Sequence, residues 1–325
     1  MHIVEKSFDD LLRKTLLRIQ AEGIEIDPTK GKSKELFGVI LELTNPRARI
    51  SHSENRGTIY SCLGEFLWYL AKSNDLDFVQ YYIKDYWKFS DDGKTLFGGY
   101  GPRIFGPAGL DQYTRVRTLL AENPSSRKAV IQIIKPQDLF TSSKDVPCTC
   151  SLQFAVRNDK LHMFTSMRSN DAMIGMPHDF FAFTMLQEIL ACDLSLEVGT
   201  YKHAVGSLHI YEKYLPKVEA YLAEGYQGNI PMPAMPQLNL HDAIDEVIKY
   251  EANVRGGGLD PLPTLDPYWL DLLRLLEIHA VNRTDLSYVQ KLKKWSELKD
   301  AMHSKVYEYH IRKKKPKEDK TKEPA

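Results

Sequence analysis

Two strand-like segments joined by a two-residue turn constrain the possible folds of this chain more than any other feature. In CSLQFAVR (150–157) and KLHMFTSMR (160–168), apolar and polar side chains alternate, as they do in a strand with one buried face. The residues between them, Asn158 and Asp159, tolerate the positive φ angles that a tight hairpin requires. The sequence therefore predicts an antiparallel pair of strands.

Other segments add strands and long apolar helices in no regular alternation. Further strands are expected at 36–43, 128–134 and 201–210, and helices at 7–20, 57–73, 115–121, 178–192 and 211–224. The helices at 57–73 and 178–192 are apolar on nearly all sides, which predicts burial on more than one face. Strands and buried helices without a repeating strand–helix–strand unit are typical of an α+β domain.

The character of the chain changes after residue 226. A connector rich in proline and methionine, NIPMPAMPQ, leads to expected helices at 241–254, 267–279 and 286–312. The final segment, KKKPKEDKTKEPA, is charged and poor in apolar residues, so we expect it to be disordered. The sequence thus predicts a main domain (1–226), a helical extension (227–312) and a charged tail (313–325).

Charge and cysteine content argue against several classes of protein. Lysine plus arginine equals aspartate plus glutamate at 43 each, so no overall charge attracts nucleic acid or a membrane surface. No segment is long and apolar enough to cross a bilayer, and the charged N-terminus does not resemble a secretory signal. Four irregularly spaced cysteines do not form a disulfide framework. We expect a cytoplasmic protein with free thiols.

Two of these cysteines, Cys148 and Cys150, stand close together directly after Pro147. A Cys-x-Cys pair is a poor zinc signal, because structural zinc sites usually have two pairs with wider spacing, so no metal site is expected. Cys62 and Cys192 fall within helices expected to be buried, where they would be small apolar residues of the core. By composition alone Cys148 would also be structural, but its neighbouring segments favour a nucleophile.

Seven short segments give Cys148 a chemical context. In chain order they are Glu65-Phe66-Leu67-Trp68, Tyr100-Gly101, Ser126-Arg127-Lys128, Pro147-Cys148 with Gln153-Phe154, Arg168-Ser169-Asn170-Asp171, Gly175-Met176-Pro177, and Gly206-Ser207-Leu208-His209-Ile210-Tyr211. Over roughly residues 30–215, their order and spacing resemble those of the thymidylate synthase family. The resemblance implies that family's α+β fold, a mixed sheet packed with long buried helices.

The resemblance also implies covalent chemistry on a pyrimidine nucleotide. In this family a cysteine thiolate, here Cys148, adds to C6 of the base, and C5 then takes a one-carbon unit from 5,10-methylenetetrahydrofolate. Arg168 would favour the thiolate as a nearby cation. Glu65 would direct protons and water around the base, a task for a buried carboxyl whose pKa is raised.

Binding roles follow from the same resemblance. The phosphate would be held by Arg168 and Ser169 of one subunit and by Arg127 and Lys128 of the other, which implies a homodimer with shared active sites. The other substrate-binding residues would be Gln153, His209 and Tyr211, of which the last two would contact the sugar. The folate would contact Asp171, Trp87 and Gly175. Two positions depart from the family pattern. Lys128 replaces a second arginine, and the loop at 28–34 lacks an arginine that Lys30 or Lys32 could replace.

The position after His178 discriminates between substrates. Thymidylate synthases have an asparagine there that matches the O4 and N3 edge of uracil, whereas this chain has Asp179. A carboxylate only accepts hydrogen bonds, so it suits the amino group of cytosine and opposes O4 of uracil. In this respect the chain resembles the cytidylate and deoxycytidylate hydroxymethylase branch of the family. The structural alternative is an acid capping the helix that follows.

The hydroxymethylase interpretation predicts that water, not hydride, completes the reaction on CMP or dCMP. Lys84, at a position where the family commonly has a second tryptophan near the folate, would help water to enter.

Two alternatives stay open: a C5 methyltransferase of the same fold acting on dUMP or dCMP, and a non-catalytic nucleotide-binding member of the family. Arg168 could be an ordinary ion-paired arginine, and His209 and Tyr211 could be core residues. No residue distinguishes ribose from deoxyribose.

Overall fold

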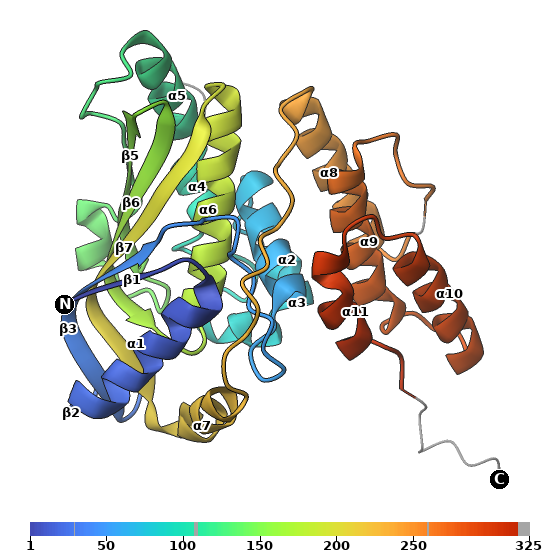
Figure 1. Ribbon diagram of the computed structural model, residues 1–325, viewed down its shortest axis with the longest axis horizontal. Helices are drawn as coiled ribbons and strands as arrows, with labels where there is room; N and C mark the ends of the chain where they lie inside the picture. The colour runs from blue at the N-terminus through green and yellow to red at the C-terminus, as the bar shows by residue number, and fades with distance from the viewer. Residues whose placement is uncertain (29, 107–109, 259, 318–325) are drawn as a thin grey trace. The chain divides into compact units, whose positions relative to one another are not determined.

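The computed structural model describes residues 1–28, 30–106, 110–258 and 260–317 (Figure 1). The chain forms two compact units, Met1–Gln237 and Leu238–Ala325. Residues 227–237, which the sequence analysis assigned to the helical extension, belong to the first unit. In that connector, the Met232 N–H donates to the Arg47 carbonyl at 2.8 Å, and the Met235 N–H donates to Glu188 at 3.2 Å. Most of the expected charged tail, 318–325, lies outside the described residues.

The first unit is built on a mixed sheet. Within the described residues its strands are β1 (His2–Glu5), β2 (Ile24–Ile26), β3 (Ser33–Leu43), β4 (Val130–Gln132), β5 (Thr149–Arg157), β6 (Lys160–Asp171) and β7 (Glu197–Tyr211), in the order β1-β3-β7-β6-β5-β4 with β2 paired to β3. The pairs β1–β3 and β6–β7 are parallel and the other pairs are antiparallel. The predicted hairpin of β5 and β6 is confirmed, with φ of 51° at Asn158 and 57° at Asp159.

Helices pack against one face of this sheet. In the first unit they are α1 (Phe8–Glu22), α2 (Ile59–Leu70), α3 (Leu76–Tyr82), α4 (Tyr100–Ile104), α5 (Gln112–Glu122), α6 (Met176–Asp193) and α7 (Leu215–Ala223), with 3₁₀ turns η1 (Lys84–Phe89), η2 (Pro136–Phe140) and η3 (Glu212–Tyr214). The rings of Phe8 in α1 and Phe180 in α6 are 5.2 Å apart, so both helices lie on the same face, as Figure 1 shows. The short elements β1, β2, α3 and α4 were not predicted.

The predicted burial of the two apolar helices is confirmed. In α6, 14 of 18 residues are buried, and in α2, 10 of 12. The close approach of α3 to α2 depends on Gly64, because a Cβ there would lie 2.1 Å from Cγ of Tyr82. This packing places the α2 carboxylate of Glu65 in the interior of the unit, where it is 5% exposed.

The second unit is helical, as predicted, but its last expected helix is divided. Its elements are α8 (Leu240–Arg255), α9 (Pro267–Val281), α10 (Tyr288–Asp300), η4 (Lys305–Tyr307) and α11 (Glu308–Lys313). The prediction of one helix over 286–312 is wrong because Asp271 of α9 accepts the backbone N–H groups of His303 and Ser304, which holds the chain in a turn. The Trp295 indole then donates to the Ile311 carbonyl at 3.1 Å, fastening α11 against α10.

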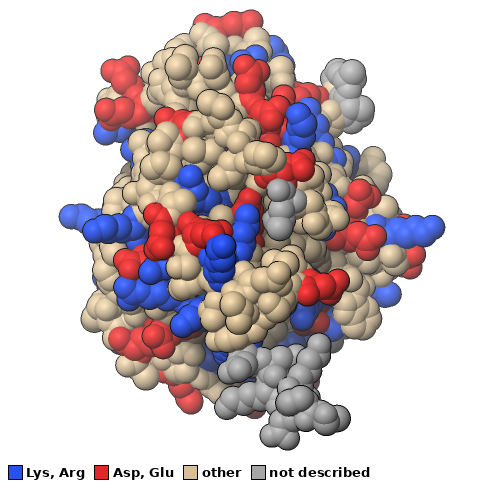
Figure 2. Space-filling model, turned by 90° about the vertical axis from the view of Figure 1, so that its right-hand side faces the viewer, with Lys and Arg blue, Asp and Glu red and all other residues tan. Residues whose placement is uncertain are grey.

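The surface agrees with the balanced charge. Figure 2 shows lysine and arginine side chains interspersed with aspartate and glutamate on the face that it presents. No helix within the described residues is both long and apolar enough to cross a membrane.

Candidate active site

Cys148 lies at the start of β5 and is held there by Arg168 of β6. The Arg168 backbone N–H donates to the Cys148 carbonyl at 2.9 Å. Its guanidinium donates from Nε to the Pro147 carbonyl and from Nη2 to the Val146 carbonyl, both at 2.9 Å. Arg168 therefore fixes the backbone that carries the thiol, a role that sequence reasoning did not foresee.

The surroundings of Cys148 act on its charge in opposite directions. Burial raises the pKa of the thiol, whereas Arg168 and Lys30 lower it and the carboxyls of Asp179 and Asp145 raise it. Arg168 thus favours the thiolate, as expected, but burial outweighs it and the resting group is a thiol. Lys30, one of the two lysines that could replace the missing loop arginine, is close enough to act on the charge of the cysteine.

Asp179 lies in the first turn of α6 and is partly buried. Its Oδ2 accepts a hydrogen bond from Asn170 Nδ2 at 2.6 Å. Burial, reinforced by the negative charge of Glu65, raises the pKa of Asp179 to about 8, while the Asn170 hydrogen bond opposes the shift. The carboxyl is therefore mainly protonated at neutral pH and can both donate and accept. The capping alternative is wrong, because α6 begins at Met176 with Gly175 as its N-cap and no side-chain cap.

Behind Asp179 lies a buried hydrogen-bond chain. Asn170 Oδ1 lies 3.3 Å from Nε2 of His203, and Nδ1 of His203 lies 2.7 Å from the Tyr201 hydroxyl. Burial lowers the pKa of His203 to about 3, so its ring is neutral, and an Nε2–H tautomer satisfies both contacts. Gly175 leaves room for this arrangement, because a Cβ there would lie 3.3 Å from Asn170 Nδ2. The chain therefore fixes the orientation of the Asn170 amide.

Glu65 accepts hydrogen bonds at both carboxylate oxygens. Oε1 accepts the hydroxyls of Tyr69, at 3.2 Å, and Tyr86, and Oε2 lies 2.6 Å from His178 Nδ1. Burial alone would raise the pKa of Glu65, but the charge and hydrogen bond of His178, helped by both hydroxyls, lower it. The expectation of a raised pKa is therefore wrong, because the partner histidine was not foreseen.

Residues expected at the sugar and the folate lie along the ends of β6 and β7. The rings of His209 and Tyr211 are 4.8 Å apart, so both side chains project to the same side. Asp171 pairs with His209 in register, and its Oδ1 accepts the N–H groups of Met173 and Ile174. Burial raises the pKa of Tyr211, and the charges of Asp171 and Cys148 add to it, so these groups lie near one another. Ser169 lies beside Ser207 in the same pair of strands.

Other expected site residues lie elsewhere in the chain. Gln153 is exposed and belongs to a row across the sheet with Val130, Phe164, Lys202 and Glu42, on the face opposite its buried neighbours Leu152 and Phe154. Arg127 and Lys128 lie in the exposed loop that precedes the edge strand β4. The structure does not bring these three residues to Cys148 within one chain.

Trp87 lies on η1, next to Tyr86, whose hydroxyl donates to Glu65. Its side chain is 57% exposed, which is unusual for tryptophan and leaves a ring face open to a planar ligand. Lys84 begins the same 3₁₀ turn. The segment thus presents one aromatic and one cationic side chain next to the residues that hold Glu65.

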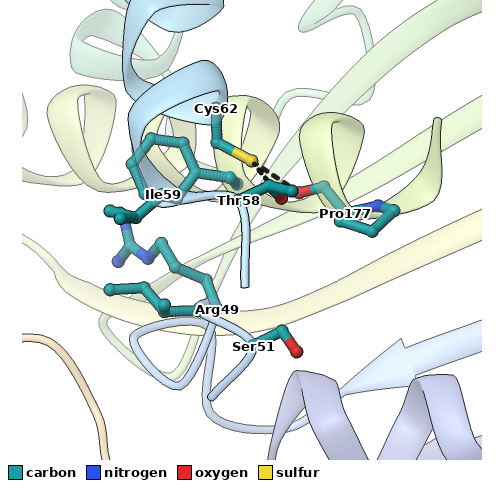
Figure 3. A pocket seen from close by; sticks show the side chains of 8 residues that line it. Arg49, Ser51, Thr58, Ile59, Cys62 and Pro177 are labelled. Atoms are coloured by element: carbon teal, nitrogen blue, oxygen red, sulfur yellow. Dashed lines mark hydrogen bonds between the residues drawn. The ribbon is translucent and has the colours of Figure 1, made fainter. Parts of the chain in front are cut away.

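The two helical cysteines differ in exposure. Cys62 is buried as predicted; its sulfur lies 3.4 Å from the Thr58 hydroxyl and 3.7 Å from the Pro177 carbonyl, and burial raises its pKa to about 12. It borders a cavity of about 10 Å³, shown in Figure 3, which is the size of one water molecule. Cys192 is only half-buried, so its predicted burial is wrong.

No group of three or more histidine, cysteine, aspartate or glutamate side chains within residues 1–28, 30–106, 110–258 and 260–317 is arranged to hold a metal ion. All four cysteines are free.

Comparison with known proteins identifies the family. The thymidylate synthase family model matches residues 19–254, which is most of the chain. The chain belongs to the thymidylate synthase family. This family member is 31% identical over 232 residues to a deoxyuridylate hydroxymethyltransferase of Bacillus phage SP01, and 27% identical over 217 residues to one of Delftia phage PhiW-14. These matches cover 66% and 62% of this chain and 60% of each relative.

A thymidylate synthase of Bacillus subtilis subsp. natto is also similar, at 31% identity over 162 residues, which are 47% of this chain and 57% of the relative. The matched part of this family member thus spans about 60% of the length of the relatives. The expected family and its α+β fold are confirmed.

Proposed function

We propose that this protein is a pyrimidine-nucleotide C5 hydroxymethyltransferase that acts on CMP or dCMP with 5,10-methylenetetrahydrofolate. The observation that carries the proposal is the buried carboxyl of Asp179 within electrostatic reach of the Cys148 thiol. A nucleophile beside a base-recognition group is what covalent activation of a pyrimidine at C6 requires. The hydroxymethyltransferase names of two relatives support water as the final reactant.

The chain's own residues account for the steps. Cys148, as thiolate, bonds to C6 of the base, and the displaced electron pair makes C5 nucleophilic. Once C5 has taken up the one-carbon unit, loss of the C5 proton to water and departure of tetrahydrofolate would leave an exocyclic methylene. Water then adds its oxygen to that carbon and gives its proton to the carboxylate of Glu65. The electron pair that moves into the ring then expels the Cys148 thiolate from C6, which restores the aromatic base.

Asp179 is the proposed base-recognition group. In its protonated form the O–H donates to N3 of cytosine and the carbonyl oxygen accepts from the N4 amino group. Asn170 donates to Oδ2, so the proton of the neutral carboxyl resides on Oδ1. A fixed proton makes the two oxygens distinct, as a selective site requires.

A second candidate is the same reaction on dUMP. It is favoured by the names of the two phage relatives and by the neutral state of Asp179, because a carboxylic acid can also donate to O4 and accept from N3–H. The two candidates respond differently to pH. Ionisation of Asp179 removes the donor from both complexes, but the N4–H bond of cytosine to a carboxylate becomes stronger, whereas O4 of uracil then faces a negative charge.

Features of the described residues fit a folate as co-substrate. Arg56 is 7% exposed, and its Nε has no hydrogen-bond partner among the described residues, while its charge acts on the neighbouring carboxyl of Asp171. A buried, incompletely paired arginine favours an anionic or carbonyl-bearing ligand. The exposed ring of Trp87 would stack on a planar group, and Gly175 keeps the α6 N-terminus clear. The folate supplies the one-carbon unit.

We also propose a homodimer in which Arg127 and Lys128 complete the phosphate site of the partner. The sheet row of Val130, Gln153 and Phe164 is solvent-exposed, and apolar side chains on an open sheet face favour burial against another surface. Gln153 would then contact the partner subunit. Arg168 and Ser169 would hold the phosphate from the same subunit as Cys148.

The direct test incubates the purified protein with methylenetetrahydrofolate and each of CMP, dCMP, UMP and dUMP, and measures product masses. We expect a hydroxymethyl adduct on a cytidine nucleotide and none with Cys148→Ser. Turnover of dUMP alone would support the second candidate, and an added methyl group would support a methyltransferase. Mixing inactive Cys148→Ser with inactive Arg127→Ala should restore activity if sites are shared between subunits.

A further inference from the structure

The ion pair between His178 and Glu65 joins two helices inside the candidate site. His178 Nδ1 lies 2.6 Å from Glu65 Oε2, and the two side chains are 13% and 7% exposed. On its other side, His178 Nε2 lies 3.4 Å from the Ser61 hydroxyl. His178 thus bridges α6, where it precedes Asp179, to two residues of α2.

The two carboxyls that flank this histidine have pKa values displaced in opposite directions. Burial raises that of Asp179 to about 8 and would do the same to Glu65, but the charge and hydrogen bond of His178 reverse the direction for Glu65. Each carboxylate disfavours ionisation of the other, so one negative charge is the stable state for the pair. When the pKa values of two neighbouring carboxyls are displaced in opposite directions, the one with the raised pKa can act as a proton donor and the other as a base.

Other groups near Glu65 and Asp179 do not lower the pKa of one carboxyl relative to that of the other through a positive charge. Tyr69 of α2 and Tyr86 of η1 donate to Glu65 as neutral phenols, and their pKa values are raised well above normal by burial. Cys62 of α2 is a neutral thiol, and Tyr100 of α4 is a neutral phenol beside Asp179. Arg56 acts on Cys62 and Asp171 instead. Among these groups, His178 is the basic side chain in hydrogen-bond contact with a carboxyl, 2.6 Å from Glu65 Oε2.

We propose that His178 decides which of the two buried carboxyls holds the shared proton: it keeps Glu65 anionic and so leaves Asp179 as the neutral acid. His178 is a positioning residue in this scheme, because it acts through Glu65. The inference deepens the proposed function, on which its consequence for catalysis rests. An anionic Glu65 accepts the proton of the water that adds to the exocyclic methylene, and a neutral Asp179 donates to the base.

The first test reads the protonation state without any turnover. Infrared difference spectra between the protein and its Glu65→Gln variant isolate the Glu65 carboxyl at pH 7. We expect a carboxylate band in the parent and a protonated carboxylic acid band in His178→Gln, which keeps a hydrogen-bond donor but removes the charge. A carboxylate band in both, or an acid band in both, would overturn the proposal.

Two further variants guard against trivial explanations. His178→Phe keeps a planar ring of similar size but carries no charge, so it provides the measurement if His178→Gln does not fold. His162→Gln is the matched control: this histidine contacts Thr200 on β6 and β7, away from both carboxyls, and the Glu65 carboxylate band should persist. Loss of that band in His162→Gln would contradict the assignment to His178.

The second test is the pH dependence of turnover. The acid limb of kcat should move up by at least about one pH unit in His178→Gln, with KM for the nucleotide changed by less than about threefold. An unmoved limb in an active variant refutes the catalytic consequence. If the parent protein turns over no nucleotide at all, the proposed function fails, while the infrared result still decides the proton assignment.

Discussion

Replacing Asp179 by asparagine tests, through the free energy of unfolding, whether the Asp179 carboxyl is protonated in the folded protein. The folded protein binds a proton at Asp179 up to about pH 8, whereas the unfolded chain releases it near pH 4. Between these values the folded state holds the extra proton, so this residue makes the parent protein less stable as pH rises. Asparagine does not titrate, and its carbonyl can still accept from Asn170. The variant should therefore gain stability relative to the parent as pH increases.

The size of the change in unfolding free energy follows from the shift in the pKa of Asp179. A shift from 3.8 to about 8 corresponds to ~6 kcal/mol at about 1.4 kcal/mol per unit, present in full only above pH 8. Relaxation around the buried charge reduces this figure, and the asparagine amide leaves a donor that costs ~1 kcal/mol unless it is paired. We expect a gain of ~2 kcal/mol at pH 8 and none at pH 4.

The assay is urea unfolding of parent and variant at half-unit steps from pH 4 to pH 8.5. Asp85→Asn is the matched control, because the Asp85 side chain is 73% exposed and its replacement should give a nearly constant difference. A difference between Asp179→Asn and the parent that stays flat across this range would refute the buried, protonated carboxyl. A variant that becomes progressively less stable as pH rises would reverse the sign and do the same.

Four substitutions give further expectations. Cys148→Ser should reduce product formation by at least about a thousandfold, measured by product mass, since an alcohol replaces the attacking thiolate. A lysine cannot reproduce the two fixed donors of Arg168, so Arg168→Lys should change both the alkylation rate of Cys148 and the KM for the nucleotide. Parental values of both would contradict the role of Arg168 in holding the backbone before Cys148. Gly64→Ala should lower the unfolding free energy by ~2 kcal/mol or more, because its Cβ meets the Tyr82 ring; unchanged thermal unfolding would contradict this. Asp179→Asn should shift base preference toward uridylate in competition assays, and unchanged preference would remove Asp179 from base recognition.

Much of the fold was predictable because its signals are local. Alternation along β5 and β6, with Asn158 and Asp159 between them, determines a hairpin without reference to the rest of the chain. The division of the last helix was not predictable, because the side chain that holds the turn, Asp271, comes from a different helix. Local pattern gives no information on such a partner.

The site shows the same limit. Cys148 stood out through its motifs, but the state of Glu65 depends on His178, 113 residues away, and the orientation of Asn170 depends on His203. A buried glutamate has a raised pKa when alone and a lowered one beside an imidazolium, so its proton affinity follows from a contact that only the fold creates. The signal available in the sequence was the histidine itself, next to the aspartate that drew notice.

The attachment of Arg168 to the backbone before Cys148 has a consequence for ligand choice. In the proposed function, a phosphate that draws the guanidinium toward itself also pulls on the carbonyls of Val146 and Pro147, so phosphate binding would shift the backbone that carries Cys148. A nucleoside without its phosphate would exert no such pull on Arg168, so Cys148 should attack it poorly even where its base fits.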